Sequence, residues 1–305
     1  MKYLLERIHS LRNDMYPSRK RGVAGRVTLR RDPVVYGGPN PPPLLDLEQV
    51  DAYRQQGYIV LENVFSEREV QVFQKELETL KEDNDIRSSD ELITELESEE
   101  VRSVFRIHER SSLFRKLSRD NRISNIARYI LDDEVYIHQS RANYKPGFRG
   151  KDFYWHSDFE TWHVEDGMPR MRALSVSVIL TESRNYNGPL MLIPKSHHHY
   201  IGCDGETPEG HYLSSLKKQE LGIPSDDHLR RLTSEGGIKS VTGKPGSLVV
   251  FDCNLMHGSS SNISPYPRSN LFFVFNALSN KVEDPFCSLP PRPEYICTRK
   301  SISVI

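Results

Sequence analysis

The chain has 305 residues, which is enough for one large β-domain with additions or for two small domains. Its 41 basic and 42 acidic residues leave a formal net charge of −1, so charge gives no reason to expect nucleic acid or an anionic membrane as a partner. No apolar run approaches the roughly 20 residues of a membrane span, and the four cysteines form no Cys-x-x-Cys pair, so we expect a cytoplasmic protein with reduced thiols and no membrane association.

Residues 1–45 differ from the rest of the chain. The stretch from Ser18 to Arg31 is strongly basic, and the run from Gly37 to Pro43 is too rich in glycine and proline for a helix or an inner strand. We predict a basic, proline-rich arm that lies over the domain or is mobile, and a solvated segment explains its charge better than nucleic-acid binding. Residues 46–305 are expected to form a single domain.

Helical patterns follow this arm. Ser66 and Glu69 have the spacing of a capping box, and apolar residues at helical spacing predict a helix over residues 70–81. The apolar run at 57–61 is typical of a strand. The acidic segment 82–102 is interpreted either as a lid or as a solvated face.

From Val135 onward the pattern becomes rich in β-structure. Short apolar or alternating runs recur, separated by glycine and proline turns, at residues 135–145, 153–159, 173–181, 189–193, 246–253 and 270–277. Many short strands after a helical start predict a β-sandwich or barrel with helices packed outside it.

The motif His156-Ser157-Asp158 carries the strongest chemical signal. Alternate residues of a strand point to the same side, so His156 and Asp158 can share one metal ion, with His257 from the end of a later strand as a third ligand. Two imidazoles and one carboxylate leave coordination positions open, as in non-haem Fe(II) oxygenases. Arg268, eleven residues beyond His257, suits a second carboxylate such as the far end of 2-oxoglutarate.

Two strands are predicted to line the rest of a pocket. Four polar side chains share one face of the first strand: Gln139, Arg141, Asn143 and Lys145. They fit either a wet pocket beside the His156 motif or the exposed face of an edge strand. Three residues share the functional face of the last strand: Arg268, Asn270 and Phe272.

Four further histidines and one tryptophan lie near these motifs in the sequence and are not interpreted as metal ligands. His197, His198 and His199 alternate in direction in an extended chain, so they cannot all bind one ion, and we interpret them as loop residues. His163 lacks the register of the His156 pair. Trp162 is expected in a loop at the pocket mouth, where its ring could hold a delocalised cation.

The arrangement of these motifs resembles the phytanoyl-CoA dioxygenase superfamily of Fe(II)/2-oxoglutarate oxygenases. The runs at 153–175 and 187–197 are most similar to the signature of its ectoine hydroxylase branch, and the resemblance extends from about residue 46 onward. It implies a mostly β fold with flanking helices around a double-stranded β-helix, a jelly-roll or cupin-like core.

The resemblance also implies roles for the matching positions. The ligands of Fe(2+) would be His156, Asp158 and His257. The 2-oxoglutarate contacts would be Phe105, Asn143, Lys145, Ser259 and Arg268. The ectoine contacts would be Gln139, Arg141, Thr161, Trp162, Ser175, Asn270 and Phe272.

The implied reaction consumes O2 and 2-oxoglutarate, hydroxylates L-ectoine to 5-hydroxyectoine and releases succinate and CO2. This is a step of compatible-solute synthesis in the response to osmotic and temperature stress, and the family suggests a homodimer. Two alternatives remain at this point. One is hydroxylation of another small zwitterion such as proline, and the other is a non-catalytic metal-binding β-domain, which would have no need of Arg268.

Overall fold

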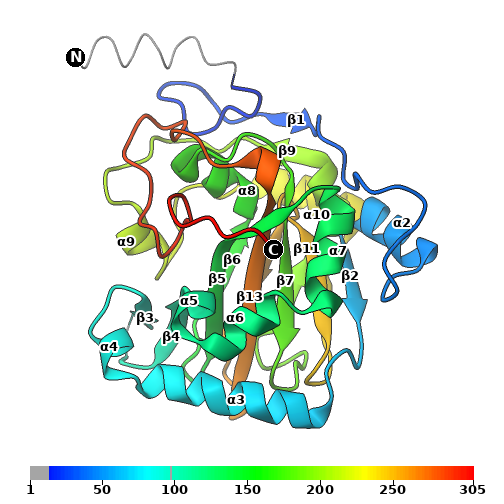
Figure 1. Ribbon diagram of the computed structural model, residues 1–305. Helices are drawn as coiled ribbons and strands as arrows, with labels where there is room; N and C mark the ends of the chain where they lie inside the picture. The colour runs from blue at the N-terminus through cyan, green and yellow to red at the C-terminus, as the bar shows by residue number, and fades with distance from the viewer. Residues whose placement is uncertain (1–13, 97) are drawn as a thin grey trace.

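Two antiparallel sheets form the centre of the fold in the computed structural model, which describes residues 14–96 and 98–305 (Figure 1). The larger sheet contains β2 (Tyr58–Leu61), β11 (Leu248–Asp252), β7 (Ala173–Ile179), β13 (Arg268–Ala277), β5 (Val135–Lys145), β4 (Val101–Phe105) and β3 (Leu92–Thr94), in that order. The smaller sheet contains β10 (Lys239–Val241), β8 (Leu190–Leu192), β12 (His257–Ser259) and β6 (Phe153–His156). The strands predicted from residue 135 onward are therefore confirmed, apart from details of their ends.

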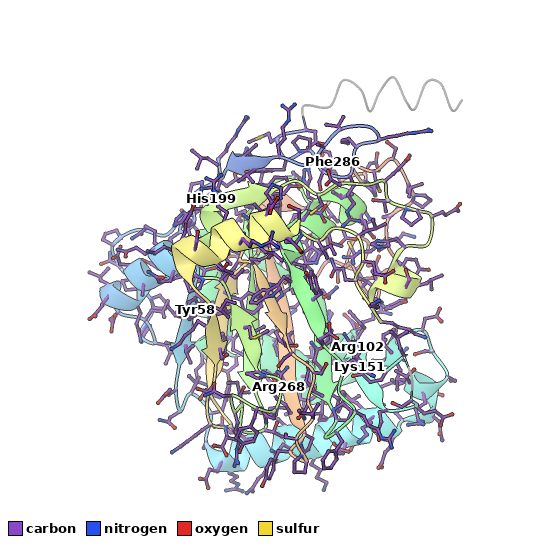
Figure 2. The ribbon with its side chains drawn as sticks, turned by 180° about the vertical axis from the view of Figure 1, so that it is seen from behind. Tyr58, Arg102, Lys151, His199, Arg268 and Phe286 are labelled. Carbon is purple, nitrogen blue, oxygen red and sulfur yellow. The ribbon has the colours of Figure 1, made fainter. Side chains whose placement is uncertain are left out.

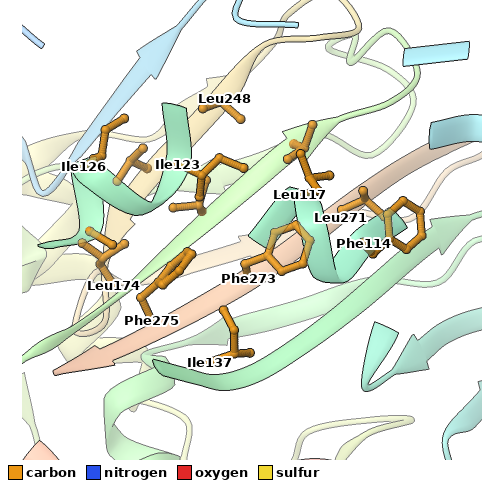
Figure 3. Packing of buried hydrophobic residues seen from close by; sticks show 14 of the residues in the cluster. Phe114, Leu117, Ile123, Ile126, Ile137, Leu174, Leu248, Leu271, Phe273 and Phe275 are labelled. Carbon is orange, nitrogen blue, oxygen red and sulfur yellow. The ribbon is translucent and has the colours of Figure 1, made fainter. Parts of the chain in front are cut away.

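The larger sheet has one face toward the helices and one toward the smaller sheet. On its outer face, α3 (Glu67–Glu82), α6 (Ser112–Ser118) and α7 (Asn121–Leu131) cover an apolar cluster that includes Phe273 and Phe275 of β13 (Figure 3). On its inner face, Phe251 and Phe272 join a second cluster that reaches Leu192 of the smaller sheet. The two sheets thus pack face to face, in the predicted mostly β, jelly-roll arrangement with flanking helices.

The helix predicted at 70–81 is confirmed as the longer α3. Ser66 is its N-cap, and the Glu69 side chain accepts a bond from the Ser66 N–H, which completes the predicted capping box. An equivalent capping box at Asp46 and Gln49 begins α2 (Leu47–Gln56). The other helices of the described residues are α4 (Asn84–Arg87), α5 (Ile107–Arg110), α8 (Asp158–Thr161), α9 (Tyr212–Ser215) and the longer α10 (Asp226–Gly236), with helical turns at Trp162–Asp166, Ser196–His198 and Leu278–Asn280.

The acidic segment 82–102 is part of the larger sheet's edge, and most of its acidic side chains are exposed, as expected for a solvated face: Glu82, Asp83, Asp85, Asp90, Glu99 and Glu100. Apart from residue 97, which lies outside the described residues, it forms α4, β3 and the start of β4, and so extends the larger sheet at one edge. Glu95 is buried and pairs with buried Arg102 at 3.0 Å. An acidic residue can lie inside the fold here because a cation from the neighbouring strand accompanies it.

The described part of the arm packs on the domain. Its strand β1 (Val27–Leu29) pairs with β9 (His199–Ile201). Arg19 pairs with Glu160, and Arg30 pairs with Asp252, with all four side chains buried. The expectation of a solvated basic segment is therefore wrong for these two arginines, because each meets a buried carboxylate distant in sequence. Residues 1–13 of the predicted arm lie outside the described residues.

No helix in the described residues is long and apolar enough to cross a bilayer.

Candidate metal centre and active site

The structure brings His156, Asp158 and His257 together at one edge of the smaller sheet. His156 is the last residue of β6, and its cross-strand partner is His257, the first residue of β12. The sequence pattern predicted Asp158 in a strand, but it is the first residue of α8. It still shares a side with His156 because Ser157 between them is extended, with φ −104° and ψ 128°. The prediction that His257 ends a long strand is also wrong, since β11 stops at Asp252.

Hydrogen bonds on the far side of each imidazole orient the two rings. The Nδ1 atom of His156 lies 2.6 Å from the Tyr154 carbonyl oxygen, and that of His257 lies 2.9 Å from the Leu255 carbonyl oxygen. A carbonyl can only accept, so Nδ1 carries a proton in both rings, which leaves Nε2 as the atom of each ring that can coordinate a metal. These Nε2 atoms lie 3.7 and 3.8 Å from the two carboxylate oxygens of Asp158.

This geometry fits a metal ion better than a hydrogen-bonded cluster. The three ligand atoms lie within 4.8 Å of one another, yet the contacts between Nε2 atoms and carboxylate are too long for hydrogen bonds. The buried Oδ2 atom of Asp158 has no hydrogen-bond partner among the described residues. Two nitrogen ligands and one oxygen ligand on the same side of a common metal position suit a divalent transition metal that keeps other coordination positions open.

The protonation states also suit metal binding. Burial, together with neighbouring His257, lowers the pKa of His156 to about 4. Burial opposes ionisation of Asp158, but His257, Arg141 and His156 outweigh it and lower the pKa of this carboxyl. At neutral pH the cluster therefore holds a neutral His156 imidazole and an ionised carboxylate, the forms that coordinate a metal.

A cavity of about 360 Å³ opens beside this cluster. The predicted site residues that line it are Phe105, Gln139, Arg141, His156, Asp158, Thr161 and Trp162. The predicted loop around Trp162 is wrong, because Thr161 ends α8 and Trp162 begins a π-helical turn, Trp162–Asp166. Segment 215–223 provides several of the remaining lining residues at the mouth.

Apart from His257, which belongs to the cluster, the other predicted residues are not part of the cavity lining and lie on or beside the inner face of the larger sheet. They are Asn143, Lys145, Ser175, Ser259, Arg268, Asn270 and Phe272, and all except partly buried Asn143 are buried. Cross-strand pairing sets Arg268 opposite Lys145, Asn270 opposite Asn143 and Phe272 opposite Arg141. The Arg141 guanidinium lies 4.9 Å from the centre of the Phe272 ring, which connects this layer with the cavity.

The side chains of Arg268 and Lys145 are both buried cations. Arg268 is labelled in Figure 2, which views the molecule from behind. Arg268 donates to the Asn270 Oδ1 atom at 2.7 Å, and Lys145 donates to the Ser259 hydroxyl at 2.7 Å. Within residues 14–96 and 98–305, no carboxylate lies within ion-pair distance of either group, and the Nε atom of Arg268 has no partner. Burial lowers the pKa of Arg268 to about 10, and burial together with Arg268 lowers that of Lys145. An anion that enters this layer would be strongly stabilised.

Sequence reasoning missed Arg292, a further cation of the cavity lining. Its guanidinium donates to both oxygens of Asp166, at 2.7 and 2.5 Å, and both side chains are buried. Arg292 lies in an irregular stretch between Pro291 and Pro293, where no periodic pattern indicates the direction of a side chain. Only the pairing with Asp166, 126 residues earlier, reveals it.

The histidine triplet and His163 contribute no ring to the cluster. His197 is buried, with its Nε2 atom 3.1 Å from the Arg54 carbonyl oxygen, and His163 contacts Asp14 at 2.9 Å. The predicted loop at the triplet is a 3-10 turn followed by β9, so His199 begins a strand.

A second group, His138, Asp166 and Cys297, also has donor atoms close together. It is a poor metal site, because Asp166 already forms the ion pair with Arg292 and burial keeps the pKa of the Cys297 thiol high.

Comparison with known proteins agrees with this geometry. Residues 53–270 match the phytanoyl-CoA dioxygenase (PhyH) family. The ectoine dioxygenase of Sphingopyxis alaskensis is 53% identical, across 94% of this chain and 93% of the relative, and that of Bordetella bronchiseptica is 52% identical, across 96% and 94%.

Solved structures give the same result. The crystal structure of EctD from S. alaskensis with bound Fe superposes with a TM-score of 0.85 and 46% identity, covering 96% of this chain and 97% of that one. The structure of EctD with 2-oxoglutarate and 5-hydroxyectoine gives a TM-score of 0.84 and 47% identity, covering 94% and 95%. This chain therefore belongs to the phytanoyl-CoA dioxygenase family and, within it, to the ectoine dioxygenases.

Proposed function

We propose that this chain is an Fe(II)- and 2-oxoglutarate-dependent dioxygenase that hydroxylates L-ectoine to 5-hydroxyectoine and releases succinate and CO2. One observation carries the proposal. A His–Asp–His group at the edge of the smaller sheet is linked to the buried cations Arg268 and Lys145 of the larger sheet, because Lys145 donates to Ser259, two residues after His257. Neither cation has an acidic partner among the described residues. A structural metal site has no use for such cations, whereas a co-substrate with two carboxylates needs them.

His156, Asp158 and His257 would hold the metal in this proposal. Bound iron would supply the redox chemistry that couples oxygen activation and 2-oxoglutarate decarboxylation to hydroxylation of the substrate. The carbonyl groups of Tyr154 and Leu255 keep the Nε2 atoms of both imidazoles free for it.

Arg268 and Lys145 would bind the distal carboxylate of 2-oxoglutarate. The Ser259 hydroxyl already lies 2.7 Å from the Lys145 ammonium, and Asn143 lies opposite Asn270 in the same layer. Phe105 provides an apolar wall of the cavity. A charge-assisted contact in this buried layer would be stronger than one at the surface.

Ectoine would occupy the cavity between Arg141 and Trp162. It carries a carboxylate, which suits the guanidinium groups of Arg141 and Arg292, and a delocalised amidinium, which suits an aromatic face. Trp162 lines the cavity and is nearly fully buried, so packing holds its ring in place. The further proposed contacts are Gln139 and Thr161, which line the cavity, and Ser175, Asn270 and Phe272, which lie beyond its lining on the neighbouring strands β7 and β13. The buried Ser175 hydroxyl has no hydrogen-bond partner in the described part of the chain and is therefore available to a ligand.

The biological setting is part of the same proposal. We expect a cytoplasmic homodimer that acts in compatible-solute synthesis under osmotic or temperature stress. Residues 1–45 would form an arm and residues 46–305 a single catalytic domain. The near-neutral net charge supports a small-molecule substrate rather than a nucleic acid or membrane partner.

The test is a turnover assay with the full-length chain, Fe(II), 2-oxoglutarate, O2 and ectoine. Mass spectrometry should detect a product heavier by one oxygen, in step with succinate. His257→Ala should lose this product, while His228→Ala, in a partly exposed histidine of α10, should keep it. Succinate without hydroxylated ectoine would contradict the substrate and direct attention to another zwitterion such as proline. Metal binding without either product would favour a non-catalytic domain.

A further inference from the structure

We infer that Asn254 is a positioning residue of the metal centre, which joins the two chain segments that carry the three proposed ligands. This inference rests on the proposed function. It concerns a residue that neither lines the cavity nor belongs to the His–Asp–His group. Asn254 lies in the turn between β11 and β12, three residues before His257.

The Asn254 side chain is buried, and its hydrogen bonds fix its orientation. Its Nδ2 atom donates to the His197 carbonyl oxygen at 3.1 Å and to the His199 carbonyl oxygen at 3.0 Å. Its Oδ1 atom accepts a bond from the Ser157 hydroxyl at 3.0 Å. Because both backbone carbonyls can only accept, the amide cannot be reversed without loss of these bonds.

The bond to Ser157 reaches the centre of the ligand motif. Ser157 stands between His156 and Asp158, so a displacement of its backbone moves two proposed ligands at once. Phe159, just beyond Asp158, donates its N–H to the Cys253 carbonyl at 2.8 Å, next to Asn254. The turn before His257 therefore holds the other two ligands by a side-chain bond and a backbone bond.

Further contacts brace this turn from outside. The Asn254 N–H donates to the Asp252 Oδ1 atom at 2.8 Å, and the same oxygen accepts from Arg30 at 2.7 Å. Met256, which precedes His257, donates its N–H to the Ser196 hydroxyl at 2.9 Å. The histidine triplet thus supports this turn through two backbone carbonyls and not through its imidazole rings. The arm supports it through Arg30.

The inference predicts an effect on metal affinity. Residues that orient metal ligands change affinity by roughly 10- to 100-fold when they are removed, because the ligands no longer meet at one point. We would titrate the metal-free, full-length chain with Ni(II), a redox-stable probe, by calorimetry without substrate or oxygen. Asn254→Ala should bind Ni(II) at least tenfold more weakly. Ser157→Ala, which removes only one hydroxyl, should bind it more weakly by a smaller factor.

Two variants serve as matched controls. Asn276 is another fully buried asparagine, and its Nδ2 atom donates to Tyr136 and to the Asn280 carbonyl oxygen. Asn276→Ala should lower the melting temperature but keep the Ni(II) affinity. His257→Ala should lose most of the affinity.

The outcomes separate the inference from the proposed function. Loss of affinity in His257→Ala, with full affinity in Asn254→Ala and Ser157→Ala, would overturn the inference alone. Equal weakening in Asn276→Ala would also overturn it, since the effect would then follow stability. Full affinity in His257→Ala would refute the metal centre, and the inference with it. Absence of ectoine turnover, with the predicted series of affinities, would refute the substrate and leave the inference in place.

Discussion

Arg268 and Lys145 lie directly opposite each other on the antiparallel strands β13 and β5, and both are buried. Like charges in this position destabilise a sheet, and burial adds to the cost because it removes water from both cations. The pair therefore lowers the stability of the free protein. It becomes favourable when a carboxylate occupies the space between the two groups, which links the arrangement to binding rather than to stability.

Arg268→Gln should raise the KM for 2-oxoglutarate by roughly 10- to 100-fold, the loss expected for one charge-assisted hydrogen bond pair. The KM for ectoine should change little. Steady-state assays should compare 2-oxoglutarate with 2-oxobutanoate, which lacks the distal carboxylate. The preference for 2-oxoglutarate should shrink in the variant. An unchanged preference would show that another group recognises this carboxylate.

Arg292→Lys should raise the KM for ectoine by about tenfold, because an ammonium cannot bind both oxygens of Asp166 as the guanidinium does and also offer a fixed N–H to the cavity. Lysine keeps a positive charge beside buried Asp166, so the fold should survive the change. The KM for 2-oxoglutarate, measured in the same assay, should stay at its original value. Parallel increases in both constants would instead indicate a general distortion of the site.

His197→Gln should flatten the dependence of stability on pH. Burial lowers the pKa of His197 to about 4 from the ordinary 6.5, so the folded state favours the neutral ring. The contribution of this ring to stability is complete above pH 6.5 and is lost as the pH falls toward 4.

Each pKa unit corresponds to about 1.4 kcal/mol, so this residue should account for a loss of about 2 kcal/mol between pH 7 and pH 5. Glutamine keeps an N–H for the Arg54 carbonyl oxygen that His197 now contacts. Denaturant unfolding of the metal-free chain at both pH values measures the difference. Identical pH dependence in the two proteins would assign the effect to other groups.

Phe273→Ala and Phe272→Ala should behave differently, although the residues are adjacent. Phe273 packs in the outer cluster under α6 and α7, so its truncation should lower the free energy of unfolding by about 3–5 kcal/mol and leave KM values unchanged (Figure 3). Phe272 lies on the inner face against Arg141, so its truncation should raise the KM for ectoine. Denaturant unfolding and assays on both variants would test this division of the strand, and an effect of Phe273→Ala on KM would contradict it.

Several features could be read from local patterns because they depend on neighbours along the chain. The capping box at Ser66 and Glu69 indicates where a helix begins, and the alternation in β13 separates a polar face from an apolar one. The spacing of His156 and Asp158 indicates a shared side even though Asp158 begins a helix, because one extended residue, Ser157, is sufficient.

Other features arise only from contacts between distant segments. The pairing of Arg292 with Asp166, and of Arg19 and Arg30 with buried carboxylates, gives no signal in composition or periodicity. The sequence therefore predicts a solvated basic stretch in the arm, although the side chains of two of its arginines are buried. The position of His257 at the start of β12, rather than at the end of β11, depends on a turn that crosses between the two sheets.

The sequence by itself determined the mostly β architecture, the ligand types of the candidate site and the family, since strand periodicity and motif spacing are local properties of the chain. Only the tertiary structure decided which charges are buried, which side chains line the cavity and how Asn254 connects the ligand segments. The physical reason is that burial and ion pairing depend on which residues the folded chain brings together, and those partners are here often more than 100 positions apart.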